Sequence, residues 1–194
     1  MKKSVFGAVA LILILLCFII PVFAIQITLN GCLWWMCAPE RDFQIADLEL
    51  PADLFPVGTI VNHIHPLSDN FGSVEDGTQS IYWKNGNGNA GYTVYRYSTK
   101  GVAEEYFDYQ KRIFTDSESH ESWKPPDVLS FSSETADAVY IACGDWSRRN
   151  CGMAARYQEY IVTFISVIDS DMTFSEFEKI LFYIDKQISD LLYP

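Results

Sequence analysis

The chain has 194 residues, 49% of them hydrophobic, and its 14 basic and 25 acidic side chains give a formal net charge of −11. This balance argues against nucleic-acid binding, which needs Lys and Arg on phosphates, and against docking on anionic lipid headgroups. The bland interpretation of the acidity is solubility, and the alternative is a cationic partner. The length suffices for one ordinary domain with a hydrophobic core.

Residues 1–24 have the pattern of an export signal. Two lysines precede an uncharged apolar run that ends at Pro21, and small residues follow up to Ala24. Three outcomes are open: cleavage after Ala24, retention of residues 5–25 as a membrane anchor, or lipid attachment at Cys32 in a sequence that resembles a bacterial lipobox. Each predicts an extracytoplasmic protein, either secreted or anchored to the outer face of the cytoplasmic membrane.

Residues 25–75 are predicted to be an irregular tether that lies against the following domain. Four prolines interrupt the segment, and its apolar residues follow no helical or strand period. Trp34 and Trp35 come soon after the apolar run, where indole rings favour the membrane interface or pack on the domain. Residues 76–194 are then predicted to form one globular domain.

Regular structure is expected from about residue 80. Strands at 80–84 and 92–97 flank a Gly- and Asn-rich turn that predicts a hairpin. Ser98 or Thr99 caps a helix over 100–114, with an apolar stripe at Val102, Tyr106, Tyr109 and Ile113. Four further strands are predicted at 128–131, 138–143, 153–157 and 160–168, the last apolar on both sides and therefore central.

A second helix closes the chain. Thr173 and Glu176 predict its capped start. Its buried face is predicted to comprise Phe174, Phe177, Ile180, Leu181, Ile184, Ile188 and Leu191. The order β-β-α-β-β-β-β-α predicts an α+β domain: a single antiparallel sheet of about six strands with two packed helices, preceded by the hydrophobic signal or anchor helix.

Four cysteines follow the export signal, and an oxidising compartment favours disulfides among them. Cys143 ends one predicted strand and Cys151 restarts the chain after it, so a hairpin would bring the two together. We therefore predict a Cys143–Cys151 disulfide, and Cys32 with Cys37 is a possible second one. A zinc site built from all four thiolates lacks the usual CxxC spacing.

Motifs for catalysis and cofactors are scarce. The sequence has no Gly-x-Ser-x-Gly, Walker loop or GxGxxG, so no cofactor is predicted. His63 and His65 would point the same way in an extended segment and could share a metal ion, with Asp69 as a third ligand. Acidic pairs suit glycoside cleavage, but those at 104–108 are more simply the solvated face of a helix.

Residues 144–150, which lie between the two cysteines, are the most suggestive surface. They include Trp146, Arg148 and Arg149 in an otherwise acidic protein. Trp and Arg are enriched at binding hot spots, and a disulfide at the base of the loop would lower the cost of ordering it. We predict a contact here with a small anionic or sugar ligand or with an envelope protein.

The sequence thus favours an exported, non-catalytic binding, sensing or accessory domain of the bacterial cell envelope. The alternative is an extracytoplasmic hydrolase whose site is assembled only in the fold. A third possibility is a scaffold protein of an envelope assembly, with Trp34 and Trp35 at the membrane.

Overall fold

The computed structural model describes residues 15–28, 32–33, 36–68, 71–84, 87–115 and 123–194. The chain divides into two compact units, Met1–Pro39 and Glu40–Pro194. In the first unit residues 15–28 are helical, with exposed apolar side chains such as Phe18 and Ile20. Among the described residues no helix combines the length and apolar character needed to cross a membrane. Most of the predicted export segment, residues 1–14, lies outside the described residues, as do Trp34 and Trp35.

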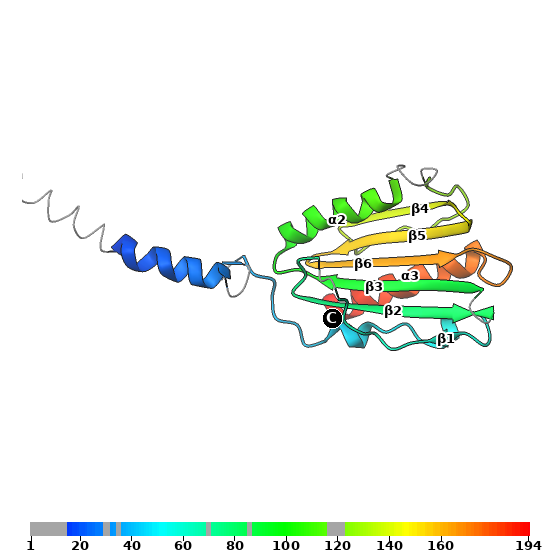
Figure 1. Ribbon diagram of the computed structural model, residues 1–194, viewed down its shortest axis with the longest axis horizontal. Helices are drawn as coiled ribbons and strands as arrows, with labels where there is room; N and C mark the ends of the chain where they lie inside the picture. The colour runs from blue at the N-terminus through cyan, green and yellow to red at the C-terminus, as the bar shows by residue number, and fades with distance from the viewer. Residues whose placement is uncertain (1–14, 29–31, 34–35, 69–70, 85–86, 116–122) are drawn as a thin grey trace, which may run out of the picture. The chain divides into compact units, whose positions relative to one another are not determined.

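The second unit is built on one six-stranded antiparallel sheet, as predicted, and the fold class is α+β. The strand order is β1-β2-β3-β6-β5-β4 (Figure 1). The strands are β1 (Ile60–Val61), β2 (Glu75–Trp83), β3 (Gly88–Arg96), β4 (Ala138–Trp146), β5 (Arg148–Tyr157) and β6 (Tyr160–Val167). The helices are α2 (Lys100–Thr115) and α3 (Phe174–Leu192), with two short 3₁₀ helices, η1 (Ile45–Leu48) and η2 (Ala52–Leu54).

The predicted element order is wrong at two places: the short strand β1 precedes the first hairpin, and residues 128–131 form no strand. The segment instead packs on α3. The backbone N–H of Ser130 donates to the Glu178 carboxylate, and the Phe131 ring lies 5.0 Å from that of Phe182. A carboxylate on α3 therefore binds the backbone N–H of Ser130, which in a strand would pair with the sheet.

Helix α3 and residues 40–55 together cover one face of the sheet. Thr173 caps α3 by accepting the N–H of Glu176. Its fully buried side chains are those predicted, except that Phe174 and Leu191 are only partly buried and Leu192 joins the core. These residues pack against Trp83, Tyr92, Phe164 and other large side chains of the strands.

The segment 40–55 belongs to the compact unit. Ile45, Leu48, Leu50 and Phe55 are buried in the core with α3. The buried amide of Gln79 holds the backbone of Leu50 at both groups, accepting its N–H at 2.9 Å and donating to its C=O at 3.1 Å. A side chain therefore supplies the hydrogen bonds that a neighbouring strand would otherwise provide.

A buried ion pair fixes where this segment starts. Arg41 donates to both carboxylate oxygens of Glu159, at 2.7 and 2.9 Å, and to the side chain of Gln158 at 3.0 Å. Glu159 lies in the β5–β6 turn and is fully buried, and its hydrogen bond raises the pKa of Arg41. The pair therefore joins the beginning of the compact unit to the turn between β5 and β6.

The opposite face of the sheet is covered mainly by α2, which lies in front of the sheet in Figure 1 and contacts β5 and β6, and Leu67 and Trp123 pack on the same cluster. Thr99 caps the helix by accepting the N–H of Val102. The buried positions are Ala103, Phe107 and Gln110.

The predicted apolar stripe of α2 is therefore partly wrong. Tyr109 is exposed, and Val102 and Tyr106 are partly buried. Tyr106 stacks on Tyr97 with the ring centroids 4.8 Å apart. The small Ala103 faces the sheet, which lets the helix approach closely, while the Ile113 side chain lies outside the description.

We predict that Arg41→Ala destabilises the protein by about 3–5 kcal/mol, because it leaves the Glu159 carboxylate buried without its partner. Urea unfolding followed by circular dichroism measures the effect. The control is the double variant Arg41→Met with Glu159→Gln, which removes both charges and is expected to recover most of the loss. Equal stability of Arg41→Ala and the wild type would contradict this role.

Candidate binding site

The predicted Cys143–Cys151 disulfide is present and lies across the β4–β5 hairpin. The two Cα atoms are 4.1 Å apart. Cys143 exchanges both of its backbone hydrogen bonds with Lys124, on the side away from β5, so it faces Cys151 as a non-hydrogen-bonded pair. Such pairs bring facing side chains closest, which explains why this register accepts a disulfide.

The second pair, Cys32 and Cys37, is also bridged, with the Cα atoms 5.2 Å apart. A sulfur engaged in a disulfide cannot carry a thioether-linked lipid, so this bridge and lipid attachment at Cys32 are mutually exclusive. Both disulfides are compatible with an oxidising compartment outside the cytoplasm. Among the described cysteines, Cys17 is free and exposed.

The hairpin tip does not bring the three predicted contact residues to one surface. Ser147 makes the turn with φ +54°, and β5 begins at Arg148. Because neighbouring side chains of a strand point to opposite faces, Arg148 and Arg149 diverge. Arg149 pairs with Asp145 at 3.1 Å, and the side chain of Trp146 lies outside the structural description.

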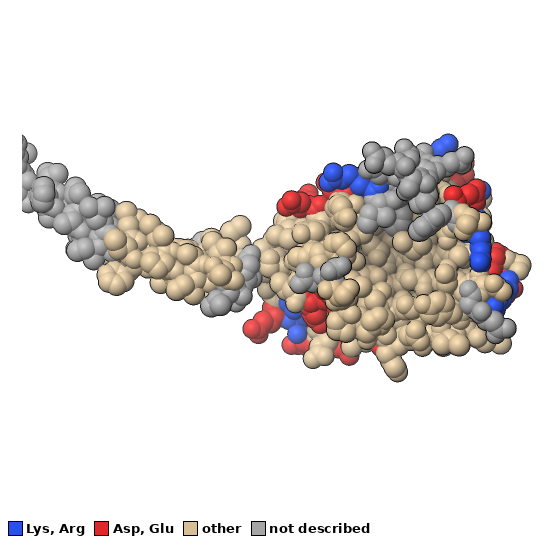
Figure 2. Space-filling view, in the orientation of Figure 1, with Lys and Arg blue, Asp and Glu red and all other residues tan. Residues whose placement is uncertain are grey.

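Arg148 lines a hollow of about 480 Å³ in the part of the sheet that α2 leaves uncovered. We call it the open-face hollow; it is lined by Tyr82, Asn89, Ala90, Gly91, Ser147, Arg148, Asn150, Ile165 and Val167. Figure 2 shows this face of the molecule, with few charged side chains at its middle and most of them around its rim. Of the described residues that line the hollow, Arg148 is the one that carries a charge.

The floor of the open-face hollow is partly apolar. Tyr82 is 40% exposed and Ile165 is 37% exposed, although β6 is otherwise buried. Gly91 lies opposite Ile165 in the sheet, and no atom lies within 4 Å of the position that a Cβ would take there. The hollow therefore offers an aromatic ring, a branched aliphatic side chain and bare backbone next to a guanidinium group.

Sequence reasoning missed these floor residues. Strand alternation in the predicted strand 80–84 separates Tyr82 from the buried Ile81 and Trp83, which was the available signal. The exposure of Ile165 could not be foreseen, because the apolar run 160–168 indicates a strand covered on both faces.

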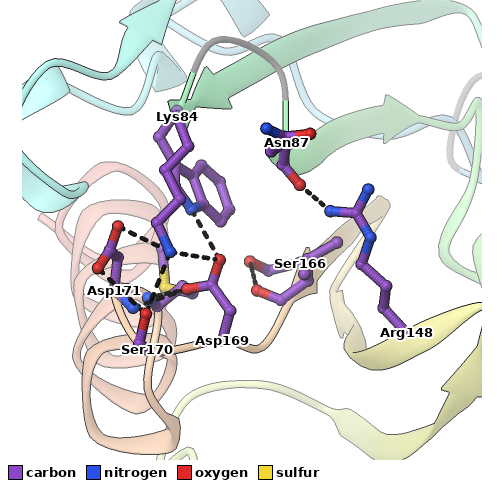
Figure 3. Close-up of polar contacts among 10 residues, drawn as sticks. Lys84, Asn87, Arg148, Ser166, Asp169, Ser170 and Asp171 are labelled. Atoms are coloured by element: carbon purple, nitrogen blue, oxygen red, sulfur yellow. Dashed lines mark hydrogen bonds and ion pairs between the residues drawn. The ribbon is translucent and has the colours of Figure 1, made fainter.

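Turns from three parts of the chain are tied together beside the hollow (Figure 3). Arg148 donates to the backbone carbonyl of Asn87, and this contact links the β4–β5 hairpin to the β2–β3 hairpin. Lys84, with φ +51°, forms ion pairs with Asp169 at 3.3 Å and with Asp171 at 2.9 Å. The start of the β6–α3 connection is thereby fastened to the end of β2.

Asp169 is the centre of the second tie. It accepts the backbone N–H groups of Asp171 and Met172 at 2.7 and 2.8 Å and the indole N–H of Trp83 at 3.4 Å. Burial opposes its ionisation, but these donors and Lys84 outweigh burial and lower the pKa of Asp169 below its usual 3.8. Asp169 and Asp171 therefore connect the β6–α3 segment to Lys84 at the end of β2.

The predicted metal fragment is exposed. His63 has a side chain 96% exposed, and its ring nitrogen Nδ1 lies 3.1 Å from the Glu49 carboxylate. His65 bridges to Thr78 through its backbone, and Asp69 lies outside the described residues. Within the described ranges no three His, Cys, Asp or Glu residues come together as a metal site.

A second hollow, of about 450 Å³, is lined by Arg149, which does not line the open-face hollow. Arg149 and Asp145 line it together with Lys124 and Asp127.

The acidic residues Glu104, Glu105 and Asp108 are exposed on α2, as expected for a solvated helix face.

We predict that replacing both Cys143 and Cys151 with alanine lowers stability by about 2.5 kcal/mol, through the closure entropy of a short loop. Thermal unfolding without reductant measures the loss. In excess dithiothreitol the variant and the wild type are expected to unfold at the same temperature, and a gap that persists there would contradict the assignment.

We predict that Asp169→Asn destabilises the protein by about 1–2 kcal/mol at pH 7, because neutral hydrogen bonds are weaker than charged ones. Because the pKa of Asp169 is lower in the folded state, its ionised form stabilises the fold at pH values above the unfolded pKa near 3.8. This stabilisation is lost as the pH falls through the folded pKa. The difference from the wild type should therefore shrink in urea titrations below about pH 3.8. A constant difference from pH 7 to pH 3 would contradict it.

Comparison of the chain with family models, with curated proteins and with solved structures finds no match in any of the three.

Proposed function

We propose that the protein is an extracytoplasmic binding module that holds a small anionic ligand with a ring, such as an acidic sugar, in the open-face hollow. The observation that carries the proposal is the lining of that hollow, where a single arginine stands over a partly apolar floor. Ligand sites combine apolar lining with a few well-placed polar groups, and this hollow has both.

The charge of the ligand follows from Arg148. None of the described residues that line the open-face hollow is acidic, although the chain as a whole is strongly acidic. A guanidinium group can form two parallel hydrogen bonds to one carboxylate, which favours an acidic ligand over a neutral one.

The ring follows from the floor. The exposed faces of Tyr82 and Ile165 lie on either side of the bare backbone at Gly91, so a flat or chair-shaped ring has room to pack there. Asn89 and Ser147 at the edge supply groups that both donate and accept hydrogen bonds, as hydroxyls on a sugar require.

The location is argued from the leader and the cysteines. Residues 1–24 carry the charge and hydropathy pattern of an export signal or anchor, and two disulfides suit an oxidising compartment. In the anchored form the N-terminal segment would hold the binding module at the outer face of the membrane. The ligand would then belong to the cell envelope or the medium.

We expect Arg148→Ala to weaken ligand binding at least tenfold, because a charge-assisted hydrogen bond contributes about 1.5–3 kcal/mol. Arg149→Ala is the matched control, since it removes the same charge from the next residue on the opposite face. The measurement is a titration of the oxidised protein with a glucuronic-acid disaccharide, followed by backbone amide shifts in NMR spectra.

Two further ligands test whether the hollow requires the acidic group and whether it requires a sugar ring. A neutral glucose disaccharide should bind more weakly than the acidic one, and benzoate tests whether an aromatic carboxylate suffices. Equal losses in Arg148→Ala and Arg149→Ala, or shifts that avoid Gly91 and Ile165, would overturn the assignment of the hollow.

A further inference from the structure

The outer edge of the sheet at β4 is open along part of its length. Cys143 directs its backbone N–H and C=O away from β5, toward Lys124. Val139 and Ile141 have the same parity in the strand, so their backbone groups also point outward. Among the described residues no backbone or side-chain partner reaches the outward groups of these two residues.

The chain itself shows that this edge accepts an antiparallel partner. Lys124 exchanges two hydrogen bonds with Cys143, at 3.0 and 2.8 Å. Pro125 and Pro126 follow at once, and because proline has no N–H the pairing cannot continue along the chain. One residue of pairing is therefore present, and the neighbouring positions along β4 are left unpaired.

A groove runs beside the unpaired positions. It has a volume of about 560 Å³, and we call it the β4-edge groove; its lining is Pro125, Pro126, Leu129, Phe131, Ser132, Ser133, Ala136, Asp137, Ala138, Val139, Tyr140 and Ile141. One wall is the edge strand, and the other is the segment 125–136.

The second wall of the β4-edge groove is held in place by α3. Ser130 bonds to Glu178, and Ser133 and Thr135 both donate to the carboxylate of Asp185. Tyr157 donates to the same carboxylate at 2.8 Å, which ties the wall to β5 as well. The groove therefore exists before anything enters it, which lowers the cost of ordering on binding.

We propose that the β4-edge groove binds an extended peptide segment of a partner protein, which adds a strand to the sheet next to β4. Its backbone would pair with Val139 and Ile141, and apolar side chains at alternate positions would enter the pocket formed by Leu129 and Phe131.

The charge of the groove determines the partner further. Asp137 is the one charged residue among the described residues of its lining; its side chain is 40% exposed although Arg156 lies 3.8 Å from the carboxylate, and the chain carries a net charge of −11. A basic residue at the Asp137 end of the peptide is therefore favoured, and an acidic peptide is disfavoured.

A single extended segment fits the groove better than a second copy of this chain does. The segment 125–136 lines the groove opposite β4, so a second copy would have to pass this segment to reach the edge. Edge-to-edge pairing of two sheets needs an edge without such a wall.

The test is selection of a displayed library of random nine-residue peptides on the oxidised protein. We expect enriched peptides to alternate β-branched or other apolar residues with polar ones and to carry Lys or Arg at one end. Val139→Pro should weaken binding of a selected peptide at least tenfold. The proline ring at position 139 removes the outward N–H and leaves the β4–β5 ladder unchanged, since an edge strand tolerates proline.

Val139→Thr is the matched control, because it keeps the N–H and the branched shape and should bind normally. A second measurement does not depend on a variant: the amides of Val139 and Ile141 should exchange with solvent rapidly in the free protein and slowly with peptide bound. Arg148→Ala should leave peptide binding unchanged, which separates this groove from the open-face hollow.

Three outcomes would overturn the proposal. They are a library that enriches no peptide, selected peptides that bind Val139→Pro as tightly as the wild type, and dimerisation in sedimentation experiments that Val139→Pro abolishes. The last outcome would assign the edge to a second copy.

Discussion

The two faces of the sheet are covered unequally, and the candidate sites follow from that inequality. One face receives the 19-residue helix α3 together with the segment 40–55, and nearly all large buried side chains lie there. The other face receives the 16-residue α2, which contacts β5 and β6, and a few further side chains such as Leu67 and Trp123. A helix is about 10–12 Å across with its side chains, so a helix that runs along the strands covers only two or three of six strands set about 4.8 Å apart. Part of the sheet, with Tyr82 and Ile165, therefore remains in contact with solvent.

The uncovered region is bordered by turns that are held firmly. Arg148 reaches Asn87, Lys84 reaches Asp169, and the Cys143–Cys151 disulfide lies at the base of the hairpin that carries Arg148. A site with such limited freedom can bind a ligand without first ordering its own loops. The rigid border and the open floor together favour recognition of a small molecule, while the free edge of β4 is suited to an extended chain.

Much of the fold could be predicted from local patterns. The Gly- and Asn-rich turn, both helix caps and the buried face of α3 each rest on residues within a few positions of one another, and so does the Cys143–Cys151 pair. The strand predicted at residues 128–131 was wrong because Ser130 bonds to Glu178, which lies 48 positions away. Which of Arg148 and Arg149 faces the hollow depended on where the turn falls, and a shift of one residue would exchange them. The open-face hollow depended on the position of α2, which no local pattern determines.

The ion pair between Arg41 and Glu159 joins residues 118 positions apart. Synthesis proceeds from the N-terminus, so the first residues of the compact unit appear long before the turn that anchors them. Until the β5–β6 turn and α3 have been synthesised, residues 41–55 lack the ion pair and much of the core on which they pack, and their apolar side chains are more accessible to chaperones and proteases. Contacts of such long range slow folding, because a large loop must close before they contribute. The β5–β6 turn and α3 therefore decide when the earliest segment of the compact unit becomes fully protected.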